Sequence, residues 1–504
     1  MRALLAATLF ALAVPSACAQ DTAAFADATD AFVAETLDRF GTVPGLAVAV
    51  VRDGETVYAR GFGHADREAQ LEATPDTPFY IASATKPFTA LLAALLDHEG
   101  TLALDATLAD LFPDVAFDSA IEADAVTVRH LLSHTAGIDN GPLAFRAAFT
   151  GQHTPTEMRR LLAGTAVEEG SPRGTFDYTN VGYNVLSLRL DEIAPWQEQL
   201  AARVFEPLGM SRTTAVASEA EGGAVPYAVH PTRGAERIAL VKHDDTMQAA
   251  GGMMASANDL ARWLAVHLDG GRLDGRQIVP ADVIAEVHRP VAVGRGESYG
   301  ALDRDGYALG WHTGTYDGDR LLHHLGGFAG FHAHTSFMPE RGVGVVVLAN
   351  EAGTGGRLAT LFATTIYDWW AAAPDARDTV MADARDAADA LYDGFQGAMA
   401  RARADLDQRA ARTWQLSLPA EAYAGTFAHP DYGTMVVEAP LADAARLAVQ
   451  FGRLHAVATP FTQPETIRVE LIPESGQTIQ FVLDGDRVRS LVWNGLPFER
   501  SRDS

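Results

Sequence analysis

The chain has a single cysteine, Cys18, among its 504 residues. One cysteine cannot form a disulfide within the chain or supply a zinc site built from several thiolates. Cys18 lies in an N-terminal segment with the features of a secretion signal, and removal of that segment would leave a protein without a thiol. Disulfides, cysteine nucleophiles and zinc–thiolate sites are therefore excluded from the mature protein.

Lysine is almost as scarce as cysteine. Of the 39 basic residues, two are lysines, Lys86 and Lys242, and the remaining 37 are arginines. An isolated surface cation in such a chain is therefore expected to be arginine. Lys86 belongs to a motif with Ser83, described below, whereas Lys242 has no partner motif and is interpreted as a surface residue.

Positive charge is in deficit overall. The chain carries 65 acidic residues against 39 basic ones, which gives a formal net charge of −26 and a pI near 4.9. Such a surface repels polyphosphates and anionic lipid headgroups. A nucleic-acid partner is therefore not expected.

Long apolar runs are confined to the N-terminus. A run from Ala3 to Val14 is followed by Ala17-Cys18-Ala19. This pattern predicts a signal peptide over residues 1–19 and an exported protein, periplasmic or extracellular. Lipoprotein anchoring at Cys18 is a minor alternative, because Pro15 stands where such signals normally carry leucine. No later window is apolar and long enough for a transmembrane helix.

Residues 20–375 have the pattern of one α+β domain. Two β-rich runs flank Asp53-Gly54 within residues 44–64, which is a strong hairpin signal, and strand-like runs return at 334–338 and 343–349. We therefore expect an antiparallel sheet that joins distant segments and is flanked by helices. The expected helices cover residues 83–98, 127–134, 156–163, 180–193, 197–205 and 257–268.

The composition changes after this domain. Residues 376–414 are rich in Ala, Asp and Arg, which predicts a charged helical linker. Residues 415–504 contain short β-prone segments separated by Gly, Pro, Asp and Asn. This spacing is typical of a small antiparallel β-barrel.

Ser83 and Lys86 belong to the sequence S-A-T-K at the start of the first expected helix. Side chains three residues apart on a helix lie on the same face. Lysine can lose its proton when it is buried or close to other cations, whereas arginine cannot. The pair can therefore supply a hydroxyl nucleophile and a neighbouring amine that takes its proton.

Two further motifs carry groups suited to the same chemistry. Tyr178 and Asn180 form Y-x-N before a helix; a phenol beside a lysine can pass protons, and an amide can hold a substrate carbonyl. His324 precedes Gly326 and Gly327, and glycines at a strand let a peptide N–H face a developing oxyanion. Taken singly, the first motif is also typical of a capped turn and the second of a tight loop.

In this order, Ser83-x-x-Lys86, Tyr178-x-Asn180 and His324-x-Gly326 resemble the three motifs of the serine β-lactamase and penicillin-binding protein superfamily. The most similar branch comprises class C β-lactamases, D-aminopeptidases and related esterases. The likeness covers about residues 30–370, and it includes the segments VRHLLSHTAGI (128–138), VFEPLGM (204–210), AAGGMMASANDLARW (249–263) and YALGW (307–311). The segment YAGTFAHPDYGTMVV (423–437) resembles the lipocalin-like β-barrel appended to some of these hydrolases.

The resemblance implies a two-step acyl transfer without metal or cofactor. Ser83 is then the acylated nucleophile, Lys86 its general base and Tyr178 the proton shuttle. Asn180 would orient the substrate, with His324 and Gly326 also in the substrate site. The backbone N–H groups of Ser83 and Gly327 would form the oxyanion hole.

One position departs from the penicillin-recognising members. These carry Lys-Thr/Ser-Gly at the third motif, whose cation and hydroxyl hold the substrate carboxylate, whereas this chain has Leu325 between His324 and Gly326. Leucine cannot donate a hydrogen bond. We therefore expect hydrolysis of a small-molecule ester, amide or peptide, by an esterase or a D-amino-acid peptidase or amidase. β-Lactamase or DD-carboxypeptidase activity is the alternative, and the oligomeric state stays open.

Other patterns compete with this interpretation. Residues 296–300 match the G-x-S-x-G nucleophile elbow without its strand–turn–helix context. His130 and His134 have the spacing of zinc ligands but lack the glutamate of H-E-x-x-H, so we interpret them as packing or capping residues. A histidine cluster has no acidic residue within it, so no metal site is expected there. Its members are His323, His324, His332 and His334.

Two non-catalytic hypotheses complete the set. The chain could be an inactive relative that binds peptidoglycan fragments or acts as a sensor, or its C-terminal barrel could bind an apolar ligand. Lys86 argues against the first, because a binding pocket does not need an amine that can lose its proton.

Overall fold

The computed structural model describes residues 17–439 and 447–501. The expected signal peptide, residues 1–19, therefore lies mostly outside the described residues, and its last positions fall in the first helix, α1 (Ala17–Phe40). Within the described residues, no helix combines the length and the apolar character needed to cross a membrane.

A nine-stranded antiparallel sheet forms the centre of the molecule, in the order β12-β13-β14-β15-β16-β17-β1-β2-β3. The hairpin expected at Asp53-Gly54 is confirmed, since both turn residues have positive φ, as this tight turn requires. The strands are β1 (Gly45–Arg52), β2 (Glu55–Asp66), β3 (Leu71–Glu72), β12 (Ala292–Tyr299), β13 (Leu302–Tyr307), β14 (His312–Tyr316), β15 (Asp319–Phe328), β16 (Phe331–Met338) and β17 (Val343–Ala349).

Strands from the two ends of the domain meet at the sheet centre. β1 pairs antiparallel with β17, from Leu46 opposite Ala349 to Arg52 opposite Val343. Both strands are apolar and almost fully buried, because helices cover both faces of the sheet. The expectation of a sheet joining distant segments is therefore confirmed.

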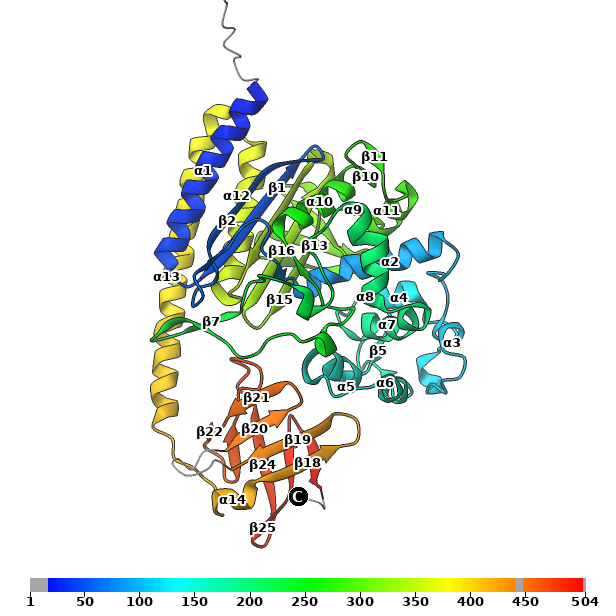
Figure 1. Cartoon of the computed structure of the whole chain (residues 1–504), viewed down its shortest axis with the longest axis vertical. Helices are drawn as coiled ribbons and strands as arrows, with labels where there is room; N and C mark the ends of the chain where they lie inside the picture. Colours follow the sequence, from blue (N-terminus) through cyan, green and yellow to red (C-terminus); the bar gives the residue numbers. More distant parts are fainter. Residues whose placement is uncertain (1–16, 440–446, 502–504) are drawn as a thin grey trace, which may run out of the picture.

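Three long helices cover one face of the sheet: α1, α12 (Gly353–Ala371) and α13 (Arg377–Ala410) (Figure 1). Val48 and Val50 of β1 pack against this layer, where Phe32 and Phe362 meet edge to face. Ala47 and Ala49 point to the opposite face, into a second core shared with the helical region. The alternation of side chains along one strand thus serves two apolar layers.

The helical region carries the expected helices, with boundaries shifted by a few residues. Its members are α2 (Lys86–His98), α3 (Leu108–Leu111), α4 (Val128–Leu132), α5 (Gly141–Phe145), α6 (Pro155–Leu162), α7 (Val181–Ile193), α8 (Trp196–Leu200), α9 (Glu206–Leu208), α10 (Ala257–Leu268) and α11 (Ala281–His288). The described part of this region also contains four two-stranded antiparallel sheets. They pair β4 (Phe79–Tyr80) with β9 (Met254–Ala255), β5 (Ile138–Asp139) with β6 (Ala166–Val167), β7 (Tyr227–His230) with β8 (Gly234–Arg237), and β10 (Arg272–Leu273) with β11 (Arg276–Gln277).

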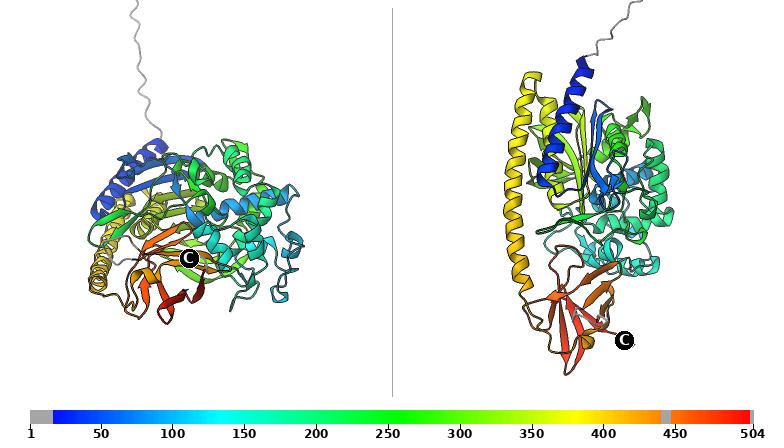
Figure 2. Two further views of the ribbon diagram at one scale, coloured as in Figure 1. Left: turned by 60° about the horizontal axis from the view of Figure 1, so that its bottom comes forward. Right: turned by 60° about the vertical axis from the view of Figure 1, so that its left-hand side comes forward.

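A second antiparallel sheet of nine strands curls into a nearly closed barrel at the C-terminal end, in the order β21-β20-β19-β18-β26-β25-β24-β23-β22. The long helix α13 runs from the central sheet down to this barrel (Figure 2). The α+β class with a following small barrel is therefore confirmed. After α14 (Ala420–Tyr423), the strands are β18 (Gly425–His429), β19 (Gly433–Glu438), β20 (Ala448–Phe451), β21 (Leu454–Val457), β22 (Thr459–Pro460), β23 (Thr466–Arg468), β24 (Thr478–Asp484), β25 (Arg487–Trp493) and β26 (Leu496–Arg500).

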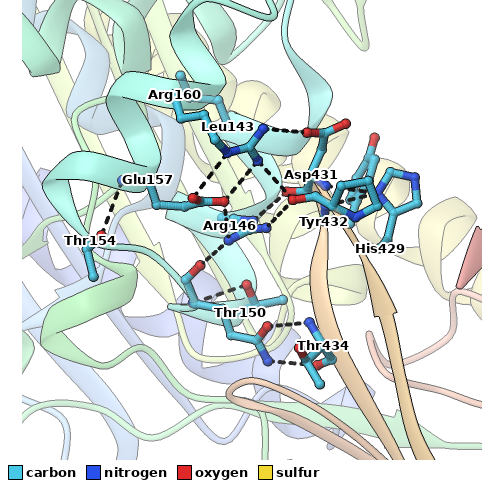
Figure 3. Close-up of polar contacts among 12 residues, drawn as sticks. Leu143, Arg146, Thr150, Thr154, Glu157, Arg160, His429, Asp431, Tyr432 and Thr434 are labelled. Atoms are coloured by element: carbon cyan, nitrogen blue, oxygen red, sulfur yellow. Dashed lines mark hydrogen bonds and ion pairs between the residues drawn. The ribbon is translucent and has the colours of Figure 1, made fainter. Parts of the chain in front are cut away.

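The barrel docks against the helical region through the turn between β18 and β19 (Figure 3). Arg146, at the end of α5, donates to the carbonyl oxygens of Pro430 and Asp431, and Arg160 of α6 pairs with the Asp431 carboxylate at 2.9 Å. Gln152 makes two hydrogen bonds to the backbone of Thr434, at 2.7 and 2.8 Å. The barrel is thus fixed by charged and amide groups as well as by apolar contact.

Candidate active site

Ser83 lies in a 3-10 turn, Ala82–Thr85, that leads directly into α2. Ala82 has φ of +45°, a left-handed conformation that is strained for a residue with a β-carbon. The half-buried Ser83 side chain borders a cavity of about 580 Å³. The turn therefore presents the hydroxyl at the wall of an open cleft.

Lys86 is completely buried one turn after Ser83. Its Nζ lies 3.1 Å from Ser83 Oγ, 2.8 Å from Asn180 Oδ1 and 2.7 Å from the carbonyl oxygen of Ala250. Burial lowers the pKa of Lys86 well below its ordinary value. A neutral amine keeps two N–H groups for Asn180 and Ala250, and its lone pair faces the serine hydroxyl.

Tyr178 and Asn180 lie just before α7, and both contact Lys86. The Lys86 Nζ lies 4.9 Å from the centre of the Tyr178 ring. Desolvation raises the pKa of Tyr178 above its usual range, and hydrogen bonding with Ser83 opposes this shift. The structure brings Ser83, Lys86, Tyr178 and Asn180 together, with Asn180 held by the lysine.

The ring of His134 packs against the ring of Tyr178. The two rings lie 4.3 Å apart, and the Nδ1 atom of His134 accepts a hydrogen bond from the backbone N–H of Thr179 at 3.3 Å. The backbone of His134 is left-handed, with φ of +59°. Sequence reasoning interpreted His134 only as a packing or capping residue, and the side-by-side rings indicate a more specific role in orienting the phenol.

Strand β15 brings the third motif against the turn that carries Ser83. A β-carbon on Gly326 would lie 1.8 Å from the carbonyl oxygen of Ile81, so only glycine permits this approach. Gly327 borders the same cavity as Ser83, as the oxyanion-hole prediction requires of it. That prediction concerns backbone N–H groups facing a substrate, and it stays a prediction.

His324 is held by protein groups on both ring nitrogens. Nδ1 lies 2.9 Å from the carbonyl oxygen of Leu325, which can only accept, so Nδ1 carries the hydrogen. Nε2, 3.0 Å from the hydroxyl of Tyr307, then accepts. Burial lowers the pKa of His324 well below its ordinary value. The sequence did not identify Tyr307 as a residue of the site, although Tyr307 begins the segment YALGW.

Neutral rings surround the cleft. Burial lowers the pKa values of His134, His312 and His323 well below the ordinary value. His312 stacks on Tyr178, with ring centres 5.9 Å apart. Arg304 brings a positive charge to the cavity wall, and its Nε lies 3.3 Å from His323 Nε2. The site therefore combines a neutral amine and phenol with uncharged imidazoles.

The competing motifs lie in ordinary structural settings. His130 caps α4, with its Nδ1 3.1 Å from the backbone N–H of Thr127, so the capping interpretation is confirmed. Residues 296–300 lie at the end of the edge strand β12, and the next element is another strand. Within the part of the chain that the structure describes, no three His, Cys, Asp or Glu side chains are grouped as metal ligands.

The interpretation of Lys242 as a surface residue is only partly right, because its side chain is half-buried. Its Nζ lies 4.4 Å from the centre of the Phe328 ring and 3.3 Å from the carbonyl oxygen of Thr246. Burial lowers the pKa of Lys242 to about 7. The contacts with Phe328 and Ala148 could not be predicted from the sequence, because both residues lie far from Lys242 along the chain.

The family model for Beta-lactamase matches residues 33–367. The chain belongs to the Beta-lactamase family. The match covers more than half of the 504 residues and includes all the residues of the candidate site.

Curated relatives in this family share about a quarter of their residues with the chain. Protein flp of Staphylococcus aureus is 24% identical over 314 residues, which is 62% of this chain and 60% of that protein. Unguisins hydrolase ungD' of Aspergillus campestris is 26% identical over 357 residues, 67% of this chain and 64% of that protein. The chain thus spans less than two thirds of the length of these relatives.

Solved structures of similar fold include an amidase, a hydrolase with acyltransferase activity and a penicillin-binding protein homologue. The D-amino acid amidase from Ochrobactrum anthropi SV3 has a TM-score of 0.55 at 24% identity, covering 68% of this chain and 97% of that one. EstCE1, a hydrolase with promiscuous acyltransferase activity, has a TM-score of 0.57 at 22% identity, covering 70% and 99%. The octameric penicillin-binding protein homologue from Pyrococcus abyssi has a TM-score of 0.57 at 22% identity, covering 93% and 98%.

Proposed function

We propose that this chain is an exported serine hydrolase that cleaves a small ester or amide through an acyl-enzyme on Ser83. The observation that carries the proposal is the buried Lys86 amine, 3.1 Å from Ser83 Oγ at the wall of the cleft, with its pKa lowered by burial. A neutral amine at this distance can take the serine proton at neutral pH.

In the first step, Ser83 Oγ attacks the substrate carbonyl carbon while its proton passes to Lys86. The backbone N–H groups of Ser83 and Gly327 stabilise the oxyanion that forms. The bond to the leaving alcohol or amine then breaks, and the leaving group takes a proton through Tyr178, whose phenol is hydrogen-bonded to Ser83. The product is an ester between Ser83 and the acyl group.

In the second step, a water molecule attacks this ester. Tyr178 and Lys86 take the proton of the water, the same oxyanion hole stabilises the second tetrahedral intermediate, and the bond between Ser83 Oγ and the acyl carbon breaks. Ser83 regains its proton and the acid product leaves. Every step uses groups of this chain and a water molecule.

The choice of an ester or amide over a β-lactam rests on the third motif. Leu325 offers no hydroxyl to a substrate carboxylate, and both ring nitrogens of His324 are engaged within the protein. The amidase and esterase folds among the solved neighbours support the same choice. We therefore propose an esterase, or a D-amino-acid peptidase or amidase.

The test is the intact mass of the purified protein after treatment with a fluorophosphonate and, separately, with a penicillin. We expect a fluorophosphonate adduct that Ser83→Ala abolishes, and no stable penicillin adduct. A stable penicillin adduct would favour the penicillin-binding alternative, and the absence of any adduct would favour an inactive binding protein. Fractionation of cells that express the full chain tests export: the mature protein is expected outside the cytoplasm with residues 1–19 removed.

A further inference from the structure

Lys242 lies in a junction between the catalytic groups and the C-terminal barrel. Its ammonium group is surrounded by the rings of Phe328, Tyr80 and Phe149, with its Nζ 4.4, 5.5 and 5.6 Å from their centres. It donates to the backbone carbonyl oxygens of Ala148 and Thr246. Among the described residues these contacts are with backbone carbonyls and aromatic rings, which stabilise the cation.

Two of these partners, Phe328 and Thr246, connect Lys242 to the catalytic groups. Phe328 is the last residue of β15 and directly follows Gly327. Thr246 begins the segment that ends at Ala250, whose carbonyl oxygen accepts the hydrogen bond from Lys86 Nζ at 2.7 Å. Lys242 therefore contacts both the strand of the expected oxyanion hole and the segment that holds the general base.

Two further partners, Ala148 and Phe149, connect Lys242 to the barrel. Ala148 and Phe149 lie in the π-helical turn Arg146–Thr150, on which the barrel docks. The carbonyl oxygen of Thr150 accepts a hydrogen bond from the backbone of Arg453 at 3.0 Å, and Phe149 packs against the barrel core. The Arg453 side chain also pairs at 2.7 Å with Asp245, which directly precedes Thr246.

A lysine suits this junction better than an arginine. The ammonium group is a compact charge with three donors on a flexible stem, whereas a guanidinium is a broad plane with a fixed fork of donors. Burial lowers the pKa of Lys242 to about 7, so keeping the cation in place has an energetic cost. In a chain with 37 arginines and two lysines, Lys86 is fully buried beside the cleft and Lys242 is half-buried among three aromatic rings.

We propose that Lys242 is a positioning residue that couples the docking of the barrel to the catalytic groups around Ser83. The proposal rests on the proposed hydrolase function. Through Thr246, Lys242 sets the place of the Ala250 carbonyl and hence of the Lys86 amine. Through Phe328, it sets the place of the Gly327 N–H. The barrel is then part of the active-site scaffold, because its contacts with the turn Arg146–Thr150 fix one wall of the lysine site.

The decisive variant is Lys242→Met, which keeps the length and the apolar contacts with the three rings and removes the cation. The matched control is Arg385→Met, which removes a cation whose hydrogen bonds run to Glu35 of α1 and Met381 of α13. We expect kcat for a p-nitrophenyl ester to fall roughly 10- to 100-fold in Lys242→Met with KM changed less than about twofold, because small displacements of catalytic groups have effects of this size. Arg385→Met is expected to keep kcat within about twofold.

A second measurement separates this proposal from the proposed function. Hydrogen–deuterium exchange, followed on peptides, is expected to accelerate in residues 243–251 and 326–331 of Lys242→Met, and to stay unchanged in β1 and β17. Absence of labelling and turnover in the wild type would contradict the hydrolase function, and the exchange experiment would still test the coupling. Unchanged exchange in both segments, or a kcat within about twofold of the wild type, would overturn the role of Lys242.

Discussion

The two lysines of the chain occupy two enclosed regions that differ in one respect. Around Lys86 the partners include a hydroxyl that can give up a proton, Ser83, together with the amide of Asn180 and one backbone carbonyl. Around Lys242 the partners among the described residues are backbone carbonyls and aromatic rings. Burial lowers the pKa of both amines, so a lowered pKa alone does not make a base. Lys86 differs from Lys242 in having a hydroxyl proton donor, Ser83, within hydrogen-bonding distance.

Ser83→Ala removes the proton donor from the first region and should have the largest effect. We expect kcat/KM for an ester substrate to fall at least about 1,000-fold, because the covalent route is lost and only binding and the oxyanion hole remain. Steady-state kinetics and fluorophosphonate labelling measure the loss. Thermal unfolding should stay close to that of the wild type. Full activity in Ser83→Ala would mean that another group is the nucleophile.

The same substitution at both lysines tests the comparison directly. Lys86→Arg should lower kcat by roughly 1,000-fold, because arginine keeps its proton and cannot act as a base. Lys242→Arg keeps the cation and should lower kcat by roughly tenfold or less. Both variants are compared by kcat at saturating substrate. Equal losses at the two positions would remove the distinction between a reactive and a positioning lysine.

Tyr178→Phe tests which group transfers the proton in the region around Lys86. Loss of the phenol hydroxyl should lower kcat by roughly 100-fold, a common size for a lost proton-transfer group. The neutral fraction of Lys86 increases as the pH rises through its lowered pKa, so the rate rises over the same range, well below the ordinary lysine value of 10.5. The pH profile of kcat/KM should keep this rising limb in Tyr178→Phe. Disappearance of the limb would assign it to Tyr178 instead.

Two buried histidines of β16, His332 and His334, also have lowered pKa values, with a smaller expected effect that concerns stability rather than catalysis. Burial lowers the pKa of His332 to about 4 and that of His334 to about 3, from 6.5. The unfolded chain therefore binds protons below pH 6.5 that the folded chain does not, and stability falls as the pH drops from 6.5 towards these values. The loss is about 1.4 kcal/mol per pH unit for each histidine.

His334→Gln tests this effect by urea unfolding at pH 7 and pH 5. Glutamine can replace the 2.7 Å contact between His334 Nε2 and Ser336 Oγ, and it does not titrate. The difference in unfolding free energy between the two pH values should narrow by about 2 kcal/mol in the variant, from the per-unit value above. An unchanged difference would mean that His334 binds no extra proton on unfolding.

Local patterns predicted most of the architecture. Asp53-Gly54 specified its hairpin because both residues accept positive φ, and helical periodicity located α2 and α7 within a few residues. The motif residues Ser83, Lys86 and Tyr178 were found because their spacing along the chain matches a known pattern. These signals lie within short stretches of sequence.

What the sequence did not reveal depends on contacts between distant segments. Lys242 was expected at the surface because it belongs to no recognisable motif, yet its hydrogen bond to Ala148 spans 94 positions. The roles of His134 and Tyr307 in the site could not be predicted either, because their contacts also join segments that are distant in sequence. Their rings meet 4.7 Å apart only after α4 and β13 have packed around the cleft. Burial and pairing of this kind are properties of the folded chain.

The pairing of β1 with β17 has a consequence for synthesis. The hairpin β1–β2 is complete when residue 66 has been made, but the partner on the other edge of β1 ends at residue 349. At typical translation rates of about 5–20 residues per second, residue 349 follows residue 66 by roughly 15–60 s. This edge therefore waits at least that long for its partner, and longer if the chain folds only after export. An apolar strand with unpaired backbone groups is prone to associate with other chains during that time. Nascent copies of this protein are therefore expected to depend on a chaperone that shields residues 45–52 until the second half of the domain emerges.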